Sequence, residues 1–306
     1  MAPLAARLPA RIAYRVACQQ GDWTFSQWSA RDADGVHLRR LLAPALGDAE
    51  AERVMRDFCR FRACEVIDVM LTRGDARALS RLVEIRGRGN LEEALRSGRG
   101  ALLCTAHFGS HLSASSLLHA AGFPLTTIGR WDWRYDTQIS ELERRLWDRI
   151  YARRVLRHRQ RPNIEPWQGR PQVAVQVAGA LRRNEVVTIS SDAPPLSNES
   201  ARAVPVPFLG RQANLLSGVV TLAELTGAPI LMMFMHRLPD YRHQVLEISA
   251  PIPLDDGPQS AFQRCVAAME AAIRANPADW YFWFQPHNLQ RLGLLGESDR
   301  GEALAR

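Results

Sequence analysis

A histidine at the end of an apolar run is the residue of this sequence best placed to do chemistry. His107 follows the run ALLCTA at residues 101–106, which is bounded by glycine and predicts a buried strand. The turn HFGS at residues 107–110 leads into a helix predicted over residues 111–121, with Ser110 as its cap. Open α/β sheets bind ligands at the carboxyl ends of their strands. An imidazole in that place can take a proton from a hydroxyl or an amine.

Two other kinds of site are weaker interpretations of the same segment. Cys104 lies inside the apolar strand, where a thiol resists ionisation, so we interpret it as a core residue. His107 and His111 have the i,i+4 spacing of a metal pair, but no glutamate stands between them and no third ligand is evident in the sequence. We therefore expect no metal. None of the cysteines forms a CxxC motif, and we expect the thiols to be reduced.

Strands that alternate with helices must position the histidine. The alternation predicts an α/β fold with a mixed, partly parallel sheet flanked by helices. The segment 193–207 is rich in proline and is predicted to be a loop. Strands are predicted at residues 101–105, 125–128, 186–190, 229–235 and 245–248, the last at a sheet edge, and helices at 172–182, 218–226 and 261–275.

The first hundred residues have a helical pattern. One helix is predicted over residues 48–71, and another over 91–97 with Asn90 as its cap. We predict a helical N-terminal region at 1–95, a single α/β core at 96–295 and a tail without fixed structure at 296–306. Arginines interrupt any secretory signal in residues 1–20. The apolar side chains of that stretch predict either a globular helix or a helix lying on a membrane surface: Leu4, Leu8, Ile12 and Val16.

The composition indicates a globular protein with a basic surface. Of 306 residues, 46% are hydrophobic and 23% charged, which excludes a disordered or fibrous chain. No run of about 18 apolar residues is present that would span a bilayer. The net charge is +7, and arginine supplies all 39 cations. The arginine-rich stretch at 134–161 is predicted to be helical. Its arginines from 144 to 161 predict a solvated helix face, or a docking surface for an acidic carrier protein or anionic headgroups. We expect no nucleic acid partner, because no nucleic-acid-binding motif is present.

Five blocks of the chain resemble the lysophospholipid acyltransferase superfamily, in its bacterial lipid A biosynthesis acyltransferase branch. The first is GRGALLCTAHFGSHLSA, preceded by GNLEEALRSGRG. TTIGR stands where that branch has an arginine block, and VVTISSDAPP where it has an aspartate after a strand. VPVPFLGRQANLLSGVVTLAELTGAPI is similar to its Pro-Phe-Phe-Gly block, and NPADWYFWFQP to its Trp-rich C-terminal block. The resemblance spans roughly residues 1 to 290.

The resemblance implies acyl transfer from a thioester on acyl carrier protein or coenzyme A to a lipid, glycolipid or small-molecule acceptor. No further cofactor is implied, and the protein would work in the cytoplasm or on the inner face of the cell membrane. In the family's H-x4-D/E motif, a histidine deprotonates the acceptor and a carboxylate five positions on orients it. Here Leu112 stands at that position. Removing such an acid can lower a rate by about 10⁴.

Three alternatives follow from this departure. Another carboxylate, first of all Asp192, orients His107; or His111 shares the work; or the protein no longer uses the ordinary mechanism. The third case covers an amine or thiol acceptor with a more easily removed proton, and an altered homologue that only binds carrier protein or lipid. Thioester hydrolysis is a weaker alternative. The resemblance also implies that Arg130 holds a phosphate of the donor or the acceptor. Backbone N–H groups near Gly109 would stabilise the oxyanion that forms during acyl transfer. The candidate substrate-binding residues are Gly109, Ser110, Arg130, Gly210 and Arg211.

Overall fold

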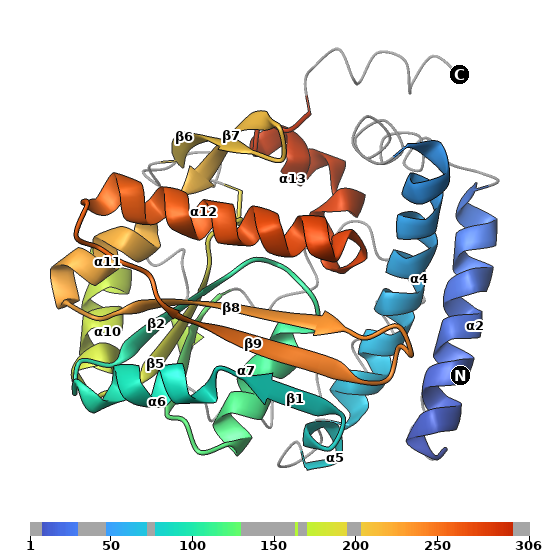
Figure 1. The fold of residues 1–306 in the computed structure, drawn as a ribbon, viewed down its shortest axis with the longest axis horizontal. Coiled ribbons are helices and arrows are strands. Elements are labelled where there is room, and N and C mark those ends of the chain that lie inside the picture. Colours follow the sequence, from blue (N-terminus) through green and yellow to red (C-terminus); the bar gives the residue numbers. More distant parts are fainter. Residues whose placement is uncertain are drawn as a thin grey trace.

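A computed structural model gives the fold of the chain (Figure 1). It describes residues 8–29, 47–71, 77–129, 163–164, 170–194 and 203–295. The arginine-rich stretch at 134–161 and the predicted tail at 296–306 lie outside the described residues, as does Arg130.

A mixed sheet forms the centre of the molecule, as predicted. Its order is β1-β9-β8-β2-β5-β3-β4, and every neighbouring pair is parallel except β8 with β9. β2 lies in the middle of the sheet and is fully buried, which explains why its sequence is apolar throughout. The strands are β1 (Val83–Arg86), β2 (Ala101–Thr105), β3 (Leu125–Ile128), β4 (Asn163–Ile164), β5 (Val186–Ser190), β8 (Ile230–Arg237) and β9 (Gln244–Pro251).

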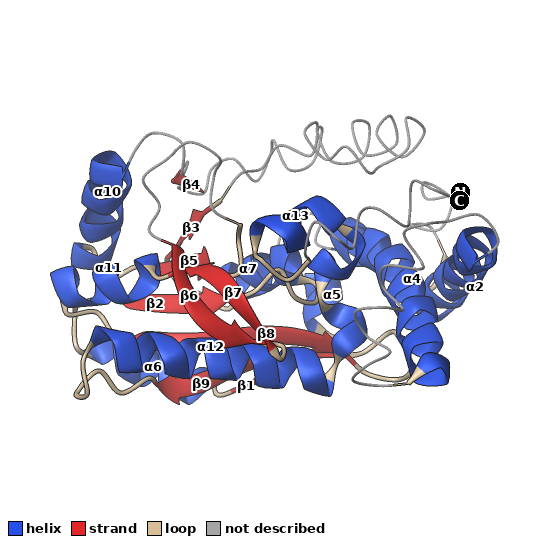
Figure 2. Cartoon of the chain, turned by 90° about the horizontal axis from the view of Figure 1, so that it is seen from above, coloured by secondary structure: helices blue, strands red, loops and turns tan. Residues whose placement is uncertain are grey.

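Helices cover both faces of the sheet (Figure 2). Alternate residues of β2 enter different cores: Leu102 packs in one cluster with α10, α11 and α12, and Leu103 in another with α6 and α7. After α12 the chain continues into two 3₁₀ helices and a short α-helix. The bounds are α6 (Arg88–Arg96), α7 (His111–Ala120), α10 (Arg170–Arg182), α11 (Gly218–Thr226), α12 (Pro258–Ala275), η5 (Pro277–Asp279), η6 (Tyr281–Phe284) and α13 (Pro286–Arg291).

The N-terminal helices form a separate layer at one end of the sheet. α2 (Ala10–Ser29) lies alongside α4 (Asp48–Leu71), and β8 points toward α4 (Figure 1). A third core cluster, which includes Tyr14 and Cys64, joins the two helices. α5 (Arg77–Ser80) then leads into β1. Within the described ranges, no helix has both the length and the apolarity needed to cross a bilayer.

Several predicted ranges agree with the structure, and four predictions are corrected. β2, β3, β5, α4 and α11 occupy the predicted residues. β1 lies within the segment 1–95 that we expected to be helical, and it pairs with β9, so β9 is not an edge strand. The sequence of β1 gives only a weak strand pattern, because the strand is short and its residues alternate between half-buried and exposed. Asn90 does not cap α6; the cap is Gly87, and the Asn90 amide donates to the carbonyl of Ile248 at 3.0 Å.

The fourth correction concerns the predicted proline-rich loop. Part of it is a strand, β6 (Ala203–Phe208), which forms an antiparallel hairpin with β7 (Arg211–Leu216). Residues alternate along β6: Pro205 and Pro207 are exposed on one side of the strand, and Val206 and Phe208 are buried on the other. In a two-stranded ribbon every second residue directs its N–H away from the partner, so proline is tolerated at such positions.

Candidate active site

The turn that carries His107 lies at the carboxyl end of the parallel part of the sheet. β2 ends at Thr105 and α7 begins at His111. Gly109 has a φ of +56°, and a Cβ atom there would lie 1.4 Å from the carbonyl oxygen of Met235. Only glycine fits so close to a neighbouring backbone at positive φ. The turn is therefore pressed against the end of β8, and its conformation is fixed by the sheet below it.

Asp192 is the partner of His107. Its Oδ1 lies 2.8 Å from Nδ1 of His107, and its Oδ2 accepts the backbone N–H of His107 at 2.8 Å and the indole N–H of Trp280 at 3.0 Å. The carboxylate is fully buried, whereas 32% of the His107 side chain is exposed. The structure thus places beside the imidazole the carboxylate that we predicted first as a substitute for the motif acid.

Strand register explains why these two residues meet. β2 and β5 are parallel neighbours in which Thr105 pairs with Ser190. His107 and Asp192 each follow two residues later, so their side chains leave the sheet side by side. Both residues lie two positions beyond the ends of their strands, and the sequence contains this spacing. The spacing predicts a contact only when it is known that β2 and β5 are neighbours in the sheet.

The charges of the pair stabilise each other. Partial desolvation lowers the pKa of His107, but the charge and hydrogen bond of Asp192 outweigh it and hold the pKa above its ordinary value. Burial raises the pKa of Asp192, yet the charge of His107 and the hydrogen bonds from His107 and Trp280 outweigh it and hold this pKa low. When Nδ1–H donates to Asp192, Nε2 presents its lone pair, and the carboxylate stabilises the imidazolium that forms.

His111 lies beside His107 but has a different character. The two rings meet edge to face at 5.4 Å, and Nδ1 of His111 is 3.2 Å from the carbonyl oxygen of Gly109. Burial and the neighbouring charge of His107 lower the pKa of His111 to about 3. His111 is therefore neutral at physiological pH and a poor proton acceptor, which does not favour the prediction that it shares the work of the base.

The Trp-rich C-terminal segment forms the wall of the site. Trp280, Phe282 and Trp283 are buried. The Phe282 ring lies 4.8 Å from the His107 ring, and the backbone N–H of Tyr281 donates to the carbonyl of His107 at 3.0 Å. The segment thus holds the turn of His107 and Asp192 together, a contact that the sequence alone does not predict.

Ser110 and Gly109 are tied to the protein rather than directed toward a substrate. The Ser110 side chain makes no capping bond to α7; it is fully buried, and its hydroxyl donates to Asp68 on α4 at 2.6 Å. The backbone N–H of Gly109 donates to the carbonyl of Asp279 at 2.8 Å. Ser110 is therefore the N-cap residue of α7 by position, as predicted, but without a side-chain capping bond. The N–H of Gly109 is already used, and an oxyanion role for other backbone donors near this glycine stays a prediction.

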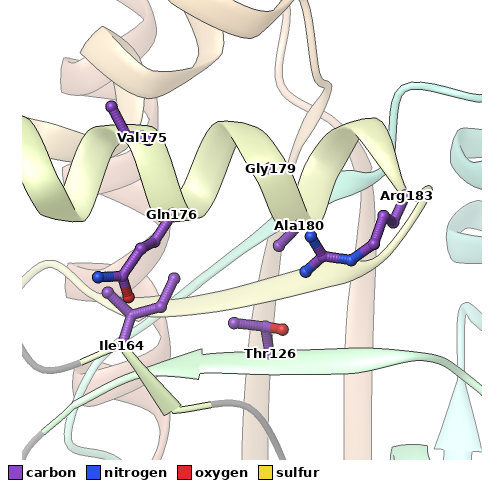
Figure 3. A pocket seen from close by; sticks show the side chains of 7 residues that line it. All are labelled: Thr126, Ile164, Val175, Gln176, Gly179, Ala180 and Arg183. Carbon is purple, nitrogen blue, oxygen red and sulfur yellow. The ribbon is translucent and has the colours of Figure 1, made fainter.

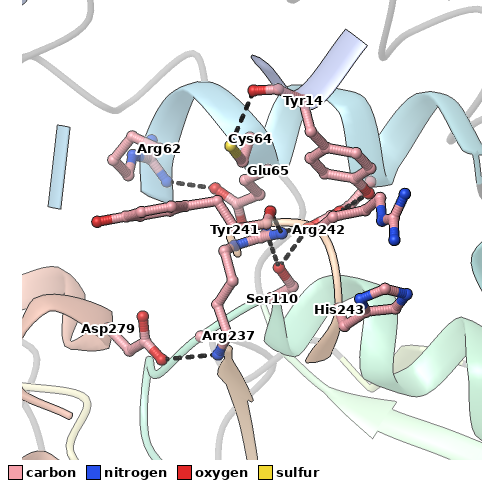
Figure 4. A network of polar contacts seen from close by, with 12 residues as sticks. Tyr14, Arg62, Cys64, Glu65, Ser110, Arg237, Tyr241, Arg242, His243 and Asp279 are labelled. Carbon is pink, nitrogen blue, oxygen red and sulfur yellow. Dashed lines mark hydrogen bonds and ion pairs between the residues drawn. The ribbon is translucent and has the colours of Figure 1, made fainter. Parts of the chain in front are cut away.

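Ser110 belongs to a buried polar network that the sequence did not reveal (Figure 4). Asp68 forms an ion pair with Arg237 at the end of β8 and accepts the Tyr14 hydroxyl at 2.5 Å. Arg237 also donates to Ser110 at 3.2 Å, and its backbone N–H donates to Asp279 at 3.1 Å. The network joins both N-terminal helices to the turn that carries His107.

The remaining predicted residues lie elsewhere. Gly210 is exposed at the tip of the β6–β7 hairpin, and Arg211 donates to the carbonyl of Leu294 at 3.1 Å. The hairpin reaches the site through Phe208, whose ring lies 5.9 Å from that of Trp280. A substrate-binding role for Gly210 and Arg211 stays a prediction. Cys104 is buried in β2 beside Ser191, and its pKa is raised, as expected of a core thiol.

Two cavities lie near the sheet. The larger, about 330 Å³, is a shallow hollow between α10 and the β3–β4 edge (Figure 3). It includes Thr126, Ile164 and Arg183, but none of the candidate catalytic residues, so it does not locate the chemistry. The smaller, about 40 Å³, borders His111.

Comparison with known proteins supplies the family. Among curated proteins, none matches the chain. The sequence profile of the bacterial lipid A biosynthesis acyltransferases matches residues 4–289, which includes the histidine turn, Asp192, the hairpin and the whole Trp-rich segment. That match covers nearly the whole chain and agrees with the resemblance of the five sequence blocks. The chain therefore belongs to the bacterial lipid A biosynthesis acyltransferase family.

Proposed function

We propose that the chain transfers an acyl group from a thioester to a hydroxyl or amine acceptor, with His107 as general base and Asp192 in place of the motif acid. The observation that supports this most directly is the 2.8 Å contact between Asp192 Oδ1 and His107 Nδ1. Family membership gives the broad activity, acyl transfer in lipid biosynthesis. The contact supplies the orienting carboxylate that Leu112 cannot provide.

In the proposed reaction, His107 first accepts and then returns one proton. Nε2 takes the proton of the acceptor as its oxygen or nitrogen attacks the thioester carbon. The new C–O or C–N bond forms, the C–S bond breaks, and the imidazolium protonates the departing thiolate. Asp192 stabilises the transient imidazolium across Nδ1. The pair needs no metal and no cofactor besides the thioester substrate.

For the donor we propose a thioester of acyl carrier protein or coenzyme A. Both are anionic, and a net charge of +7 supplied entirely by arginine attracts such partners over a distance. Arg130 is proposed to hold a phosphate of the donor or acceptor, since a guanidinium matches phosphate oxygens bidentately. The acceptor is proposed to be a lipid, a glycolipid or a small molecule.

The test is to incubate the protein with acyl-carrier and acyl-coenzyme A donors of several chain lengths and follow thioester loss and products by mass spectrometry. The decisive variant is His107→Ala, and its matched control is His119→Ala, at an exposed position of α7, the helix that follows the turn of His107. We expect turnover in the wild type and in the His119 variant, and at least a 10³-fold loss in the His107 variant, the scale of loss on removing a catalytic base.

Each other outcome would revise the proposal. Equal turnover in the His107 variant would remove this residue as the base. Release of free fatty acid alone would identify a thioester hydrolase. Binding of carrier protein or lipid without any turnover would identify an altered homologue that only binds.

We also propose that α2 rests on an anionic membrane surface. The side of α2 opposite its contact with α4 exposes Ile12, which is 48% exposed, and Trp23, which is 64% exposed, and Leu8 just before the helix is 40% exposed. Arg11 and Arg15 flank them and are exposed. An apolar stripe with tryptophan and adjacent arginines suits the interface of a bilayer that contains anionic lipids.

Vesicle binding tests this surface. In co-sedimentation, we expect the protein to bind vesicles with anionic lipid more strongly than zwitterionic vesicles. The double variant Ile12→Glu/Trp23→Glu should bind at least tenfold more weakly, because it loses apolar contact and adds negative charge, roughly 1.4 kcal/mol or more. The control is Leu225→Glu, which changes an equally exposed leucine on α11. Equal losses in both variants would show that α2 is not the binding surface.

A further inference from the structure

The sheet face under α7 changes from apolar to polar at its carboxyl end. On this face β2 begins with Ala101 and Leu103, and β5 with Val186, all in the apolar core. The residues that follow on the same face carry hydroxyl groups. Strand register places them there: Thr188 pairs with both Leu103 and Thr127, and Thr105 pairs with Ser190. A cavity of about 40 Å³ lies over this polar end. Its polar lining consists of Thr105, His111, Ser115, Thr127, Thr188 and Ser190.

Thr188 is the unusual member of this group. The residue is 4% exposed, and its Oγ1 has no hydrogen-bond partner among the residues that the structure describes. A buried hydroxyl without a partner is unfavourable, so such groups in native proteins usually bind something. Thr126, a buried threonine on the neighbouring strand β3, shows the ordinary case: its hydroxyl donates to Glu185 at 2.5 Å.

His111 provides a second polar side chain in the lining of the cavity. Its Nδ1 is 3.2 Å from the Gly109 carbonyl and donates to it, so Nε2 of the neutral ring is an acceptor. None of the described residues that line the cavity is charged at neutral pH, since His111 has a pKa of about 3. Such a lining suits a neutral group that both donates and accepts, and it does not suit a phosphate or a carboxylate.

We infer that this cavity is a binding site for one neutral hydroxyl group, held by Thr188 Oγ1 and the His111 ring next to the catalytic imidazole. Its volume of about 40 Å³ suits one small oxygen-bearing group. The hydroxyl belongs either to a water molecule or to the acceptor. The assignment to an acceptor rests on the proposed function, whereas the assignment to a polar binding site does not.

The first test compares one substitution at two positions. Thr188→Val removes a hydroxyl with no protein partner, so it loses at most a bond to the bound group. Thr126→Val leaves the Glu185 carboxylate without its donor, so its midpoint of thermal unfolding should fall further than that of Thr188→Val. A crystal structure at about 1.5 Å resolution should show an oxygen atom within hydrogen-bond distance of Thr188 Oγ1 in the wild type. A Thr188→Val midpoint that falls as far as that of Thr126→Val, or a wild-type crystal in which this hydroxyl bonds only to protein, would overturn the inference.

The second test separates the two sources of the hydroxyl. With acyl-coenzyme A alone, thioester hydrolysis that is about tenfold slower in Thr188→Val identifies water. With octyl glucoside as the acceptor probe, an acceptor KM about tenfold higher and an unchanged donor KM identify the acceptor. Thr188→Ser should restore either loss. If the wild type turns over and Thr188→Val matches it in both assays, the site is refuted. If the wild type has no activity at all, the proposed function fails, and the crystal structure alone decides the site.

Discussion

Asp192→Asn is expected to lower acyl transfer by about 10⁴ while leaving the protein folded, since the same substitution in a serine protease triad has that effect. An asparagine amide fits the space, and its oxygen can still accept from Trp280. However, it supplies no negative charge to stabilise an imidazolium at His107. The measurement is kcat with the best thioester donor. A variant that kept more than a tenth of the wild-type rate would show that Asp192 does not replace the motif acid.

The pH profile gives this variant a signature that a folding defect would not produce. A general base works only when neutral, so wild-type activity should rise as pH increases through the raised pKa of His107. Without the charge of Asp192 that pKa falls, and the acidic limb of the profile should move to lower pH. Asp279→Asn is the matched control: Asp279 is also buried near the turn, but burial raises its pKa to about 7, so a neutral amide changes less.

Arg237→Met is expected to lower the free energy of unfolding by about 3–5 kcal/mol, because it leaves the Asp68 carboxylate buried without its counter-ion. Urea unfolding followed by circular dichroism measures the change. The double variant Asp68→Leu/Arg237→Met should recover part of the loss, since it removes both charges. Arg264→Ala breaks an ion pair with Asp256 near the surface and should change stability by about 1 kcal/mol or less. A similar small change at Arg237 would contradict this account of the network.

The sequence predicts an element of this fold well when the pattern that marks the element lies within a few neighbouring residues. The ranges of β2, β3 and β5 agree with the prediction because short runs of apolar and β-branched residues bounded by turn residues are typical of strands. β1 and the β6–β7 hairpin were missed because Glu84, Arg86, Pro205 and Pro207 obscure the pattern of a strand. Their place depends on partners far along the chain, and no local pattern contains that information.

The candidate site divides in the same way. His107 was evident from its position after β2, and Asp192 was one of several open alternatives until strand pairing brought the two together. The links from Ser110 to Asp68 and from Trp280 to Asp192 join residues 42 and 88 positions apart. Such contacts follow only from tertiary packing.

The separation of His107 and Asp192 has a consequence for biosynthesis of the protein. The two residues lie 85 positions apart and meet only when β2 and β5 have paired. A nascent chain on the ribosome exposes His107 long before Asp192 has been made, and its imidazole then has ordinary basicity. The chain therefore gains the His107–Asp192 pair only when the middle of the sheet assembles, so that under the proposed function acyl transfer would report the pairing of β2 with β5.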